Sequence, residues 1–146
     1  MKIIVYSDGG ARGNPGPAGI GCVIQAQNEK DKVENLAEIS KYIGVATNNQ
    51  AEYRAVVEAL NWLIANYDVN DTSKVLLEVE FFLDSQLVVE QLNQRYKLKN
   101  EGLKPLFWQI RDLVIKLGGK VTFCHIPREQ NKKADKLVNL AIDKKE

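Results

Sequence analysis

The sequence predicts an α/β fold in which helices pack on a mixed β-sheet. Segments rich in β-branched and aromatic residues, which are typical of strands, are residues 2–8, 20–26, 36–46, 74–84 and 120–126. Segments with apolar residues at helical spacing are residues 55–67, 85–93, 103–117 and 131–142. In this order three strands come first and helices separate the later strands, which favours a single sheet covered by helices.

The length and composition of the chain fit one globular domain spanning residues 1–146. Hydrophobic residues make up 45% and charged residues 27%, as is ordinary for a soluble protein. The net charge is only +1, so nucleic-acid binding would have to depend on local features. Every apolar run is well short of the roughly 20 residues that a membrane helix needs. We expect a cytoplasmic monomer that does not bind membranes.

The cysteines and the single histidine restrict the available chemistry. Cys22, Cys124 and His125 are too few for a zinc site of the usual four-ligand type. The two thiols lie far apart in the sequence and indicate buried cysteines in a reducing compartment. One disulfide between them stays open at this point.

The first three predicted strands are joined by short connections and favour an antiparallel meander. The strand 2–8 ends at an aspartate, and the glycine- and proline-rich residues 9–19 predict a tight turn region. The strands 20–26 and 36–46 follow. A threonine and two asparagines at 47–49 then supply an N-cap signal for the first long helix.

The second half of the chain combines two further strands with three helices. In the strand 74–84 the odd-numbered apolar residues share one face. Gly118 and Gly119 end the helix 103–117, as a C-cap should. The apolar stripe of the last helix consists of Ala134, Leu137, Val138 and Ala141.

Four carboxylates lie at the ends of these predicted elements. Asp8 and Asp84 end strands, whereas Glu52 and Asp135 lie near the starts of helices. Each has a structural explanation when it is taken alone. Asp8 can form a turn with the following glycine, and Glu52 can form a capping box with Asn49. Asp84 can cap the next helix, and Asp135 can be a solvated helix acid.

Together the four acids indicate a metal site. Asp8 and Asp84 continue the apolar face of a strand, where an acid must lie at the end of the sheet or bind something positive. Two strand ends and two helix starts can meet in one patch, and carboxylates gathered there repel each other unless a divalent cation binds. Oxygen ligands of this kind suit Mg²⁺ or Mn²⁺. Two such ions about 3.5–4 Å apart activate a water and stabilise the leaving 3′ oxygen in phosphodiester cleavage.

Four motifs make the chain resemble the type 1 ribonuclease H family. They are SDGGARGNPGPAGIG (7–21), TNNQAEYRAVVEAL (47–60), FLDSQLVVEQL (82–92) and HIPREQNKKADKLVNLA (125–141). The motifs occur in the family order, and the resemblance covers essentially the whole chain. It implies a ribonuclease H-like fold, which is a five-stranded mixed sheet of three antiparallel and then two parallel strands, flanked by helices.

The resemblance also implies an activity and a cofactor. The family cleaves the RNA strand of RNA–DNA hybrids endonucleolytically and leaves 5′-phosphate and 3′-hydroxyl ends. Its metal-binding catalytic acids correspond to Asp8, Glu52, Asp84 and Asp135. The implied cofactor is Mg²⁺ or Mn²⁺, with two ions per site, and the implied partner is an RNA–DNA hybrid duplex.

Substrate contacts are implied first for the glycine-rich motif. Gly9, Gly10 and Asn14 would pack against the RNA backbone, because a residue without a side chain permits close approach. The alternative is a plain loop that closes the first hairpin.

The second set of implied contacts lies in the duplex minor groove. Thr47 would hold a DNA phosphate, and Asn48 and Asn49 would reach base edges. Gln86 would make a further minor-groove contact. Amides both donate and accept, so they can recognise base edges and 2′-hydroxyls without demanding a sequence. The alternatives are helix capping for residues 47–49 and an exposed helix glutamine for Gln86.

Two residues compete for the role of the functional basic side chain. Many family members carry a histidine in a mobile loop before the last acid, and His125 has the spacing of an ungapped match. His125 nevertheless alternates with Val121 and Phe123 in the last predicted strand. We therefore favour Arg128, which can hold a phosphate but cannot be a general base. The alternatives are a satisfied strand histidine and an ion pair of Arg128 with Glu129 or another acid.

The segment 93–104 resembles the short connector of family members that lack an inserted basic helix and loop. Basic residues that alternate with an aromatic one suit contact with a duplex backbone. The alternative is a solvated loop. The residues concerned are Arg95, Tyr96, Lys97, Lys99 and Lys104, and beside the last acid Lys132, Lys133 and Lys136.

Three other functions fit the sequence less well or stay open. A nucleic-acid-binding module without catalysis would be expected to lack one of the acids, and this chain has all four. A phosphate loop at residues 9–21 lacks the G-K-[ST] ending and precedes a predicted strand instead of a helix. A broader nuclease that also cuts RNA–RNA duplexes stays open.

Overall fold

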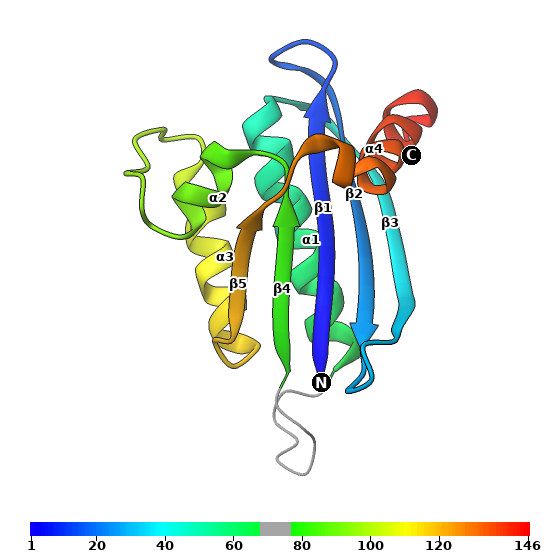
Figure 1. The fold of residues 1–146 in the computed structure, drawn as a ribbon. Helices are drawn as coiled ribbons and strands as arrows, with labels where there is room; N and C mark the ends of the chain where they lie inside the picture. Colours follow the sequence, from blue (N-terminus) through cyan, green and yellow to red (C-terminus); the bar gives the residue numbers. More distant parts are fainter. Residues whose placement is uncertain (68–76) are drawn as a thin grey trace.

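The computed structural model describes residues 1–67 and 77–146, which form one five-stranded sheet with helices on both faces (Figure 1). The order in the sheet is β3-β2-β1-β4-β5, in which β1, β2 and β3 are antiparallel neighbours and β1, β4 and β5 are parallel. The predicted five-stranded mixed sheet is confirmed. The strands are β1 (Lys2–Ala11), β2 (Gly16–Gln27), β3 (Val33–Ala46), β4 (Glu78–Leu83) and β5 (Val121–His125).

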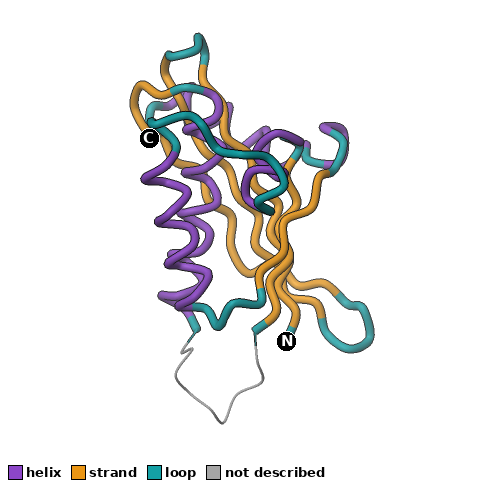
Figure 2. Tube along the Cα trace, turned by 90° about the vertical axis from the view of Figure 1, so that its left-hand side faces the viewer, coloured by secondary structure: helices purple, strands orange, loops and turns teal. Residues whose placement is uncertain are grey.

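The α-helices agree with the predicted ones to within a few residues, and one short 3₁₀-helix was not predicted. Helices α1 and α3 lie side by side on one face of the sheet (Figures 1 and 2). None of the helices in the described ranges is long and apolar enough to cross a membrane. The helices are α1 (Asn48–Asn66), α2 (Gln86–Leu92), α3 (Lys104–Lys116), the 3₁₀-helix η1 (Arg128–Gln130) and α4 (Lys132–Lys144).

Successive residues of β1 show that α1 and α4 cover opposite faces of the sheet. Neighbouring residues of a strand point to opposite sides. A methyl group at Gly9 would clash with the backbone of Ala51 in α1 and lie 2.5 Å from the Glu52 nitrogen. At Gly10 it would meet the Val138 side chain of α4 at 3.6 Å. Gly9 therefore lets the start of α1 contact the sheet directly.

The predicted turn region at residues 9–19 is wrong for most of its length. β1 continues to Ala11 and β2 begins at Gly16, so only residues 12–15 form the turn. Gly9 pairs with Ile20 and Gly10 with Gly19 in the antiparallel ladder. Glycine is favoured both in turns and where backbones pack closely. Here close packing of β1 against α1 explains why glycine occupies position 9. The predicted strand 74–84 is observed as β4, and residues 74–76 lie outside the described ranges.

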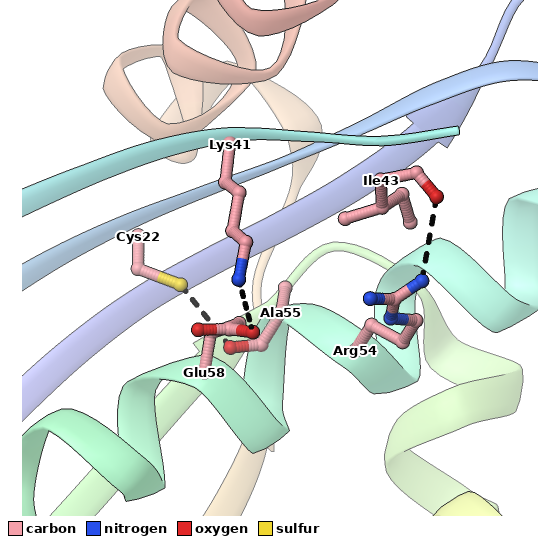
Figure 3. Close-up of polar contacts among 6 residues, drawn as sticks. All are labelled: Cys22, Lys41, Ile43, Arg54, Ala55 and Glu58. Atoms are coloured by element: carbon pink, nitrogen blue, oxygen red, sulfur yellow. Dashed lines mark hydrogen bonds and ion pairs between the residues drawn. The ribbon is translucent and has the colours of Figure 1, made fainter. Parts of the chain in front are cut away.

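Polar contacts from the middle of α1 to β2 and β3 fix the helix on the sheet (Figure 3). A thiol and a guanidinium group donate to backbone carbonyls, and one ammonium pairs with a carboxylate. This anchoring fixes the axial position of α1, and therefore the position of Glu52 near its N-terminal end. The contacts are Cys22 Sγ to the Ala55 carbonyl (3.2 Å), Arg54 to the Ile43 carbonyl (3.4 Å) and Lys41 Nζ to Glu58 (3.0 Å).

The two cysteines are free thiols on strands that do not touch. Cys22 lies on β2 and Cys124 on β5, with β1 and β4 between them. Three strand spacings of about 4.8 Å exceed the roughly 7 Å between Cα atoms that a disulfide tolerates. A disulfide within one chain is therefore excluded.

Candidate active site

The parallel strands β1 and β4 bring two of the predicted acids together. Their register pairs Tyr6 with Phe82, and the two rings stack with centroids 5.4 Å apart. Asp8 and Asp84 follow two residues further along each strand, so they continue the same face. The chain leaves β1 towards β2 on one side and leaves β4 towards α2 and β5 on the other. A crevice at strand ends of this kind is where α/β sheets commonly bind ligands.

The N-terminal part of α1 supplies Glu52, the fifth residue of the helix, without using it as a cap. Thr47 is the N-cap: its side chain accepts the Gln50 N–H at 3.1 Å, and the Gln50 side chain accepts the Thr47 N–H at 2.9 Å. The capping box is thus Thr47 with Gln50, and the alternative pairing of Asn49 with Glu52 is wrong. Glu52 is only 6% exposed, and its Oε2 has no hydrogen-bond partner among the described residues.

Asp84 is likewise not needed to cap a helix. Ser85 is the N-cap of α2, and its hydroxyl accepts the Val88 N–H at 3.3 Å. One oxygen of Asp84 accepts a hydrogen bond from the Asn131 side chain at 3.2 Å. The structural explanations for Glu52 and Asp84 therefore both fail, which leaves their carboxylates available for another role.

Three of the four predicted acids form a compact group. One carboxylate oxygen from each of Asp8, Glu52 and Asp84 lies within 4.8 Å of the others. Oxygen ligands of a single divalent ion lie up to about 4–5 Å apart, so this group fits one ion. Asp135 borders the same pocket of about 420 Å³ from α4, but its carboxylate lies outside the group. The four acids are therefore gathered in one pocket, as expected.

The electrostatics of this group favour a cation. Burial, followed by the charge of Asp84, raises the pKa of Asp8 to about 7. Burial, followed by the charge of Asp8, also raises the pKa of Glu52 well above its usual value. Carboxylates held close together out of water resist ionisation, and a divalent ion removes that cost. The orphaned oxygen of Glu52 and the all-oxygen donor set both fit Mg²⁺ or Mn²⁺.

We expect the metal-free protein to lose stability as the pH rises from about 4 to about 7. The folded chain holds a proton on Asp8 that the unfolded chain releases near pH 4, so rising pH favours unfolding. One pKa unit corresponds to about 1.4 kcal/mol, so a pKa near 7 corresponds to about 4 kcal/mol, shared among the neighbouring acids. Melting curves in EDTA between pH 4 and 8 measure this loss.

The variant Asp8→Asn is the control for this pH dependence. It keeps the oxygen that accepts the Gly9 N–H at 3.0 Å but cannot ionise. At pH 8 in EDTA it should melt at a higher temperature than the native chain, and Mn²⁺ should stabilise it less. Equal melting temperatures for both proteins across the whole pH range would contradict this account of the acids.

Known proteins match almost the whole chain. The family described as reverse transcriptase-like matches residues 6–141. LC11-RNase H1, isolated from compost by a metagenomic approach, has a crystal structure in complex with an RNA/DNA hybrid. That structure aligns with a TM-score of 0.84 and 47% identity over 97% of each chain. The chain belongs to the ribonuclease H family.

Two further relatives belong to named organisms. The ribonuclease HI of Halobacterium salinarum is 35% identical over 142 residues, which are 97% of this chain and 65% of that protein. The bifunctional protein Rv2228c of Mycobacterium tuberculosis is 39% identical over 144 residues. The match covers 98% of this chain but 36% of Rv2228c, so the chain spans about a third of that relative.

Several residues predicted to contact the substrate of a ribonuclease H lie at the acidic pocket. Gly9, Gly10, Asn48 and Asn49 border it. The side chain of Asn48 also has a structural task, because its Oδ1 accepts the Ala11 N–H at 2.8 Å. Asn48 therefore joins the start of α1 to the end of β1, and its amide nitrogen is the part left for a substrate.

The other predicted contacts lie away from the pocket lining. Thr47 caps α1, as its structural alternative proposed. Asn14 accepts the Asn48 N–H at 3.0 Å and so braces the β1–β2 turn against α1. Gln86 is an exposed residue in the first turn of α2. Their contact with a substrate stays a prediction.

The two basic candidates lie at different places in the structure. His125 is the exposed last residue of β5 and pairs with Leu83. Arg128 lies three residues later in η1 and borders the pocket, and the pocket lining within the described ranges does not include His125. The strand position that the sequence predicts for His125 is confirmed, and the geometry favours Arg128 for a role at the pocket.

Other predicted basic residues are partly engaged in surface ion pairs. Tyr96, which lies between Arg95 and Lys97 in the sequence, is 50% exposed. Exposed ion pairs contribute little, so a duplex can displace them. The pairs are Arg95 with Glu90 (3.1 Å), Lys104 with Glu101 (2.6 Å) and Lys133 with Glu38 (2.7 Å).

Two residues at the site were not predicted. Arg12 borders the pocket from the β1–β2 turn and pairs with Asp143 of α4 at 2.6 Å. Asn131 is 1% exposed and holds Asp84 through its side chain. The sequence places Asn131 at the start of the last helix, where an asparagine normally indicates a cap. Because this position suggests a helix cap, the sequence alone does not indicate that Asn131 contacts Asp84.

Proposed function

We propose that the chain is a metal-dependent endoribonuclease that cuts the RNA strand of RNA–DNA hybrids. The observation that carries this proposal is the group of three acids within 4.8 Å, with Asp135 at the same pocket. Support comes from LC11-RNase H1, whose structure holds an RNA/DNA hybrid, and from the ribonuclease HI of Halobacterium salinarum. All four acids come from one chain, so a single copy supplies the whole proposed site, and we propose that the chain acts as a monomer.

The proposed metal ligands are Asp8, Glu52, Asp84 and Asp135, and the proposed cofactor is two Mg²⁺ or Mn²⁺ ions. When bound, such ions supply Lewis-acid activation of a water and stabilisation of the leaving 3′ oxygen. The chain contributes a rigid acidic group at the ends of β1 and β4 and at the start of α1. Asp84 and Asp135 are less buried than Asp8 and Glu52, and they border the pocket where a scissile phosphate would enter. The expected products carry 5′-phosphate and 3′-hydroxyl ends.

Residues that border the pocket would orient the duplex around these acids. Gly9 and Gly10 border the pocket, so we propose that their backbone contacts the RNA. The amide groups of Asn48 and Asn49 can meet base edges or 2′-hydroxyls on the opposite side. We propose that Arg128 holds the phosphate backbone through charge-assisted hydrogen bonds. Together these groups discriminate a hybrid by shape and by its hydroxyls.

The proposed function is tested with Mg²⁺ and three end-labelled duplexes, of which the RNA–DNA hybrid is labelled in turn on each strand. We expect cleavage of the RNA strand of the RNA–DNA hybrid and no cleavage of its DNA strand or of DNA–DNA. An RNA–RNA duplex decides how broad the activity is, because it carries 2′-hydroxyls in both strands. A hybrid that is bound but left intact with either Mg²⁺ or Mn²⁺ would contradict the proposal and favour a binding module.

The variant Arg128→Ala should lower kcat/KM for the hybrid about tenfold or more. This is the size of one lost charge-assisted contact of about 1.5–3 kcal/mol. The variant His125→Ala is the matched control three residues away and should stay within about threefold of the native chain, because His125 lies at the end of an edge strand. Steady-state cleavage by both variants decides the question, and a larger loss in His125→Ala would reverse the assignment.

A further inference from the structure

A single buried residue, Asn131, connects three of the elements that carry the acids through its side chain and its backbone. The Nδ2 of Asn131 donates to the Ser7 carbonyl of β1 at 3.0 Å and to Asp84 Oδ2, just after β4, at 3.2 Å. The backbone carbonyl of Asn131 accepts the backbone N–H of Asp135 in α4 at 3.1 Å. Ser7 directly precedes Asp8 in the sequence. The Asn131 side chain therefore bonds directly to Asp84 and to the residue that precedes Asp8. Asp135 lies one helical turn after Asn131.

The orientation of this amide is fixed by its partners. The Ser7 carbonyl and the Asp84 carboxylate are both acceptors, so the nitrogen of the amide must face them. Its Oδ1 then points away and has no hydrogen-bond partner within the described residues. A buried acceptor without a partner costs stability. Asn131 also occupies the N-cap position of α4, yet its side chain turns to β1 and Asp84 instead of the helix.

We propose that Asn131 is a positioning residue for the metal site. Its amide holds Asp84 towards Asp8 and anchors the first turn of α4, which carries Asp135. The inference rests on the proposed function, because it concerns the same site. Hydrogen bonds to a ligand carboxylate orient it for the metal, and their loss typically weakens metal binding about 10–100-fold.

The neutral amide fits this role better than a charged residue would. A lysine or arginine at this position would neutralise Asp84 and compete with the metal ion for it. An aspartate would place a second carboxylate against the first and would have no proton to donate when ionised. The asparagine donates a hydrogen bond and leaves the negative charge of Asp84 available.

The test measures Mn²⁺ binding to metal-free protein by isothermal titration calorimetry. The variants are Asn131→Ala and Asn131→Leu, the second of which keeps the side-chain volume but cannot donate. Asn93→Ala is the matched control, because Asn93 also ties a helix end to a strand: its Nδ2 donates to the Phe123 carbonyl at 3.0 Å. Asn93 lies outside the pocket lining of the described residues.

We expect both Asn131 variants to bind Mn²⁺ about tenfold or more weakly than the native chain. Asn93→Ala should bind Mn²⁺ like the native chain, although all three variants melt at a lower temperature. Raising the Mg²⁺ concentration should restore hybrid cleavage in the Asn131 variants, because the defect lies in metal affinity. A purely structural role would lower the melting temperature without changing the metal dependence.

Unchanged Mn²⁺ affinity in either folded Asn131 variant would overturn the inference while leaving the proposed function intact. A native chain that neither binds Mn²⁺ nor cuts the hybrid would overturn both. If Asn131→Ala does not fold, Asn131→Leu decides the question, because it leaves no cavity. Measurements on the native chain and one folded Asn131 variant therefore distinguish a failure of this inference from a failure of the proposed function.

Discussion

Asp84→Asn should lower the rate of hybrid cleavage about a thousandfold while leaving the fold intact. Asparagine has the shape of aspartate and retains an oxygen that can accept from Asn131, so the packing around it is preserved. It lacks the negative charge that the proposed site offers to a cation. Loss of one preorganised electrostatic interaction in a reaction site typically costs about 10²–10³ in rate, and here a metal ligand is lost as well. Single-turnover cleavage of a labelled hybrid measures the effect.

Asp112→Asn is the control for this charge removal. Asp112 is an exposed residue of α3 and lies outside the acidic pocket. Its variant should cut the hybrid at the native rate, and both variants should give native-like circular dichroism. If Asp84→Asn retained a tenth or more of the native rate, the acidic group could not be the reaction site.

Gly9→Ala should weaken both the fold and the site. The added methyl group would clash with the Ala51 backbone and lie 2.5 Å from the Glu52 nitrogen, so α1 must move away from β1. Such overpacking costs about 1–3 kcal/mol, which lowers the Tm of a domain of this size by about 2–12 °C. The shift also separates Glu52 from Asp8. A displacement of about 1 Å at a reaction site can cost about 10²-fold in rate.

Gly10→Ala is the stability control for the same chemical change. Its methyl group would meet the Val138 Cγ1 at 3.6 Å, which is an ordinary contact. The variant should therefore keep a native-like Tm and native Mn²⁺ affinity, whereas Gly9→Ala loses both. Thermal melts with and without Mn²⁺ compare the two variants. Equal behaviour of Gly9→Ala and Gly10→Ala would contradict the role of close packing between β1 and α1.

The acids of the site were predictable from the sequence because each ends or begins an element. The sequence predicts that Asp8 and Asp84 end strands with apolar faces. In the structure β1 continues to Ala11, but its pairing with β4 ends at Tyr6 and Phe82, so both acids lie just beyond the parallel pairing. Asp135 lies in the first turn of α4, and Glu52 lies just after the first turn of α1. The topology that joins these ends is the same mixed sheet that the order of elements predicts. Each of the four motifs that resemble the family contains one of these acids.

Long-range contacts explain what the sequence alone could not provide. Gly9 and Gly10 were assigned to a turn, because the helix that packs on Gly9 lies more than 40 residues away in the sequence. The capping box that the sequence offered as an alternative role for Glu52, with Asn49, forms instead at Thr47 with Gln50, two residues earlier, and leaves Glu52 free. Asn131 had the pattern of a cap, and only the folded chain shows it bonded to Ser7 and Asp84.

The most direct test of the central claim is the metal dependence of RNA-strand cleavage by the native chain. The protein is freed of metal with EDTA, mixed with a hybrid labelled on its RNA strand, and titrated with Mg²⁺ or Mn²⁺. The acidic group at Asp8, Glu52 and Asp84 predicts no cleavage in EDTA and a rate that rises with metal to a plateau. Cleavage that continues at the same rate in EDTA would contradict a metal-dependent site.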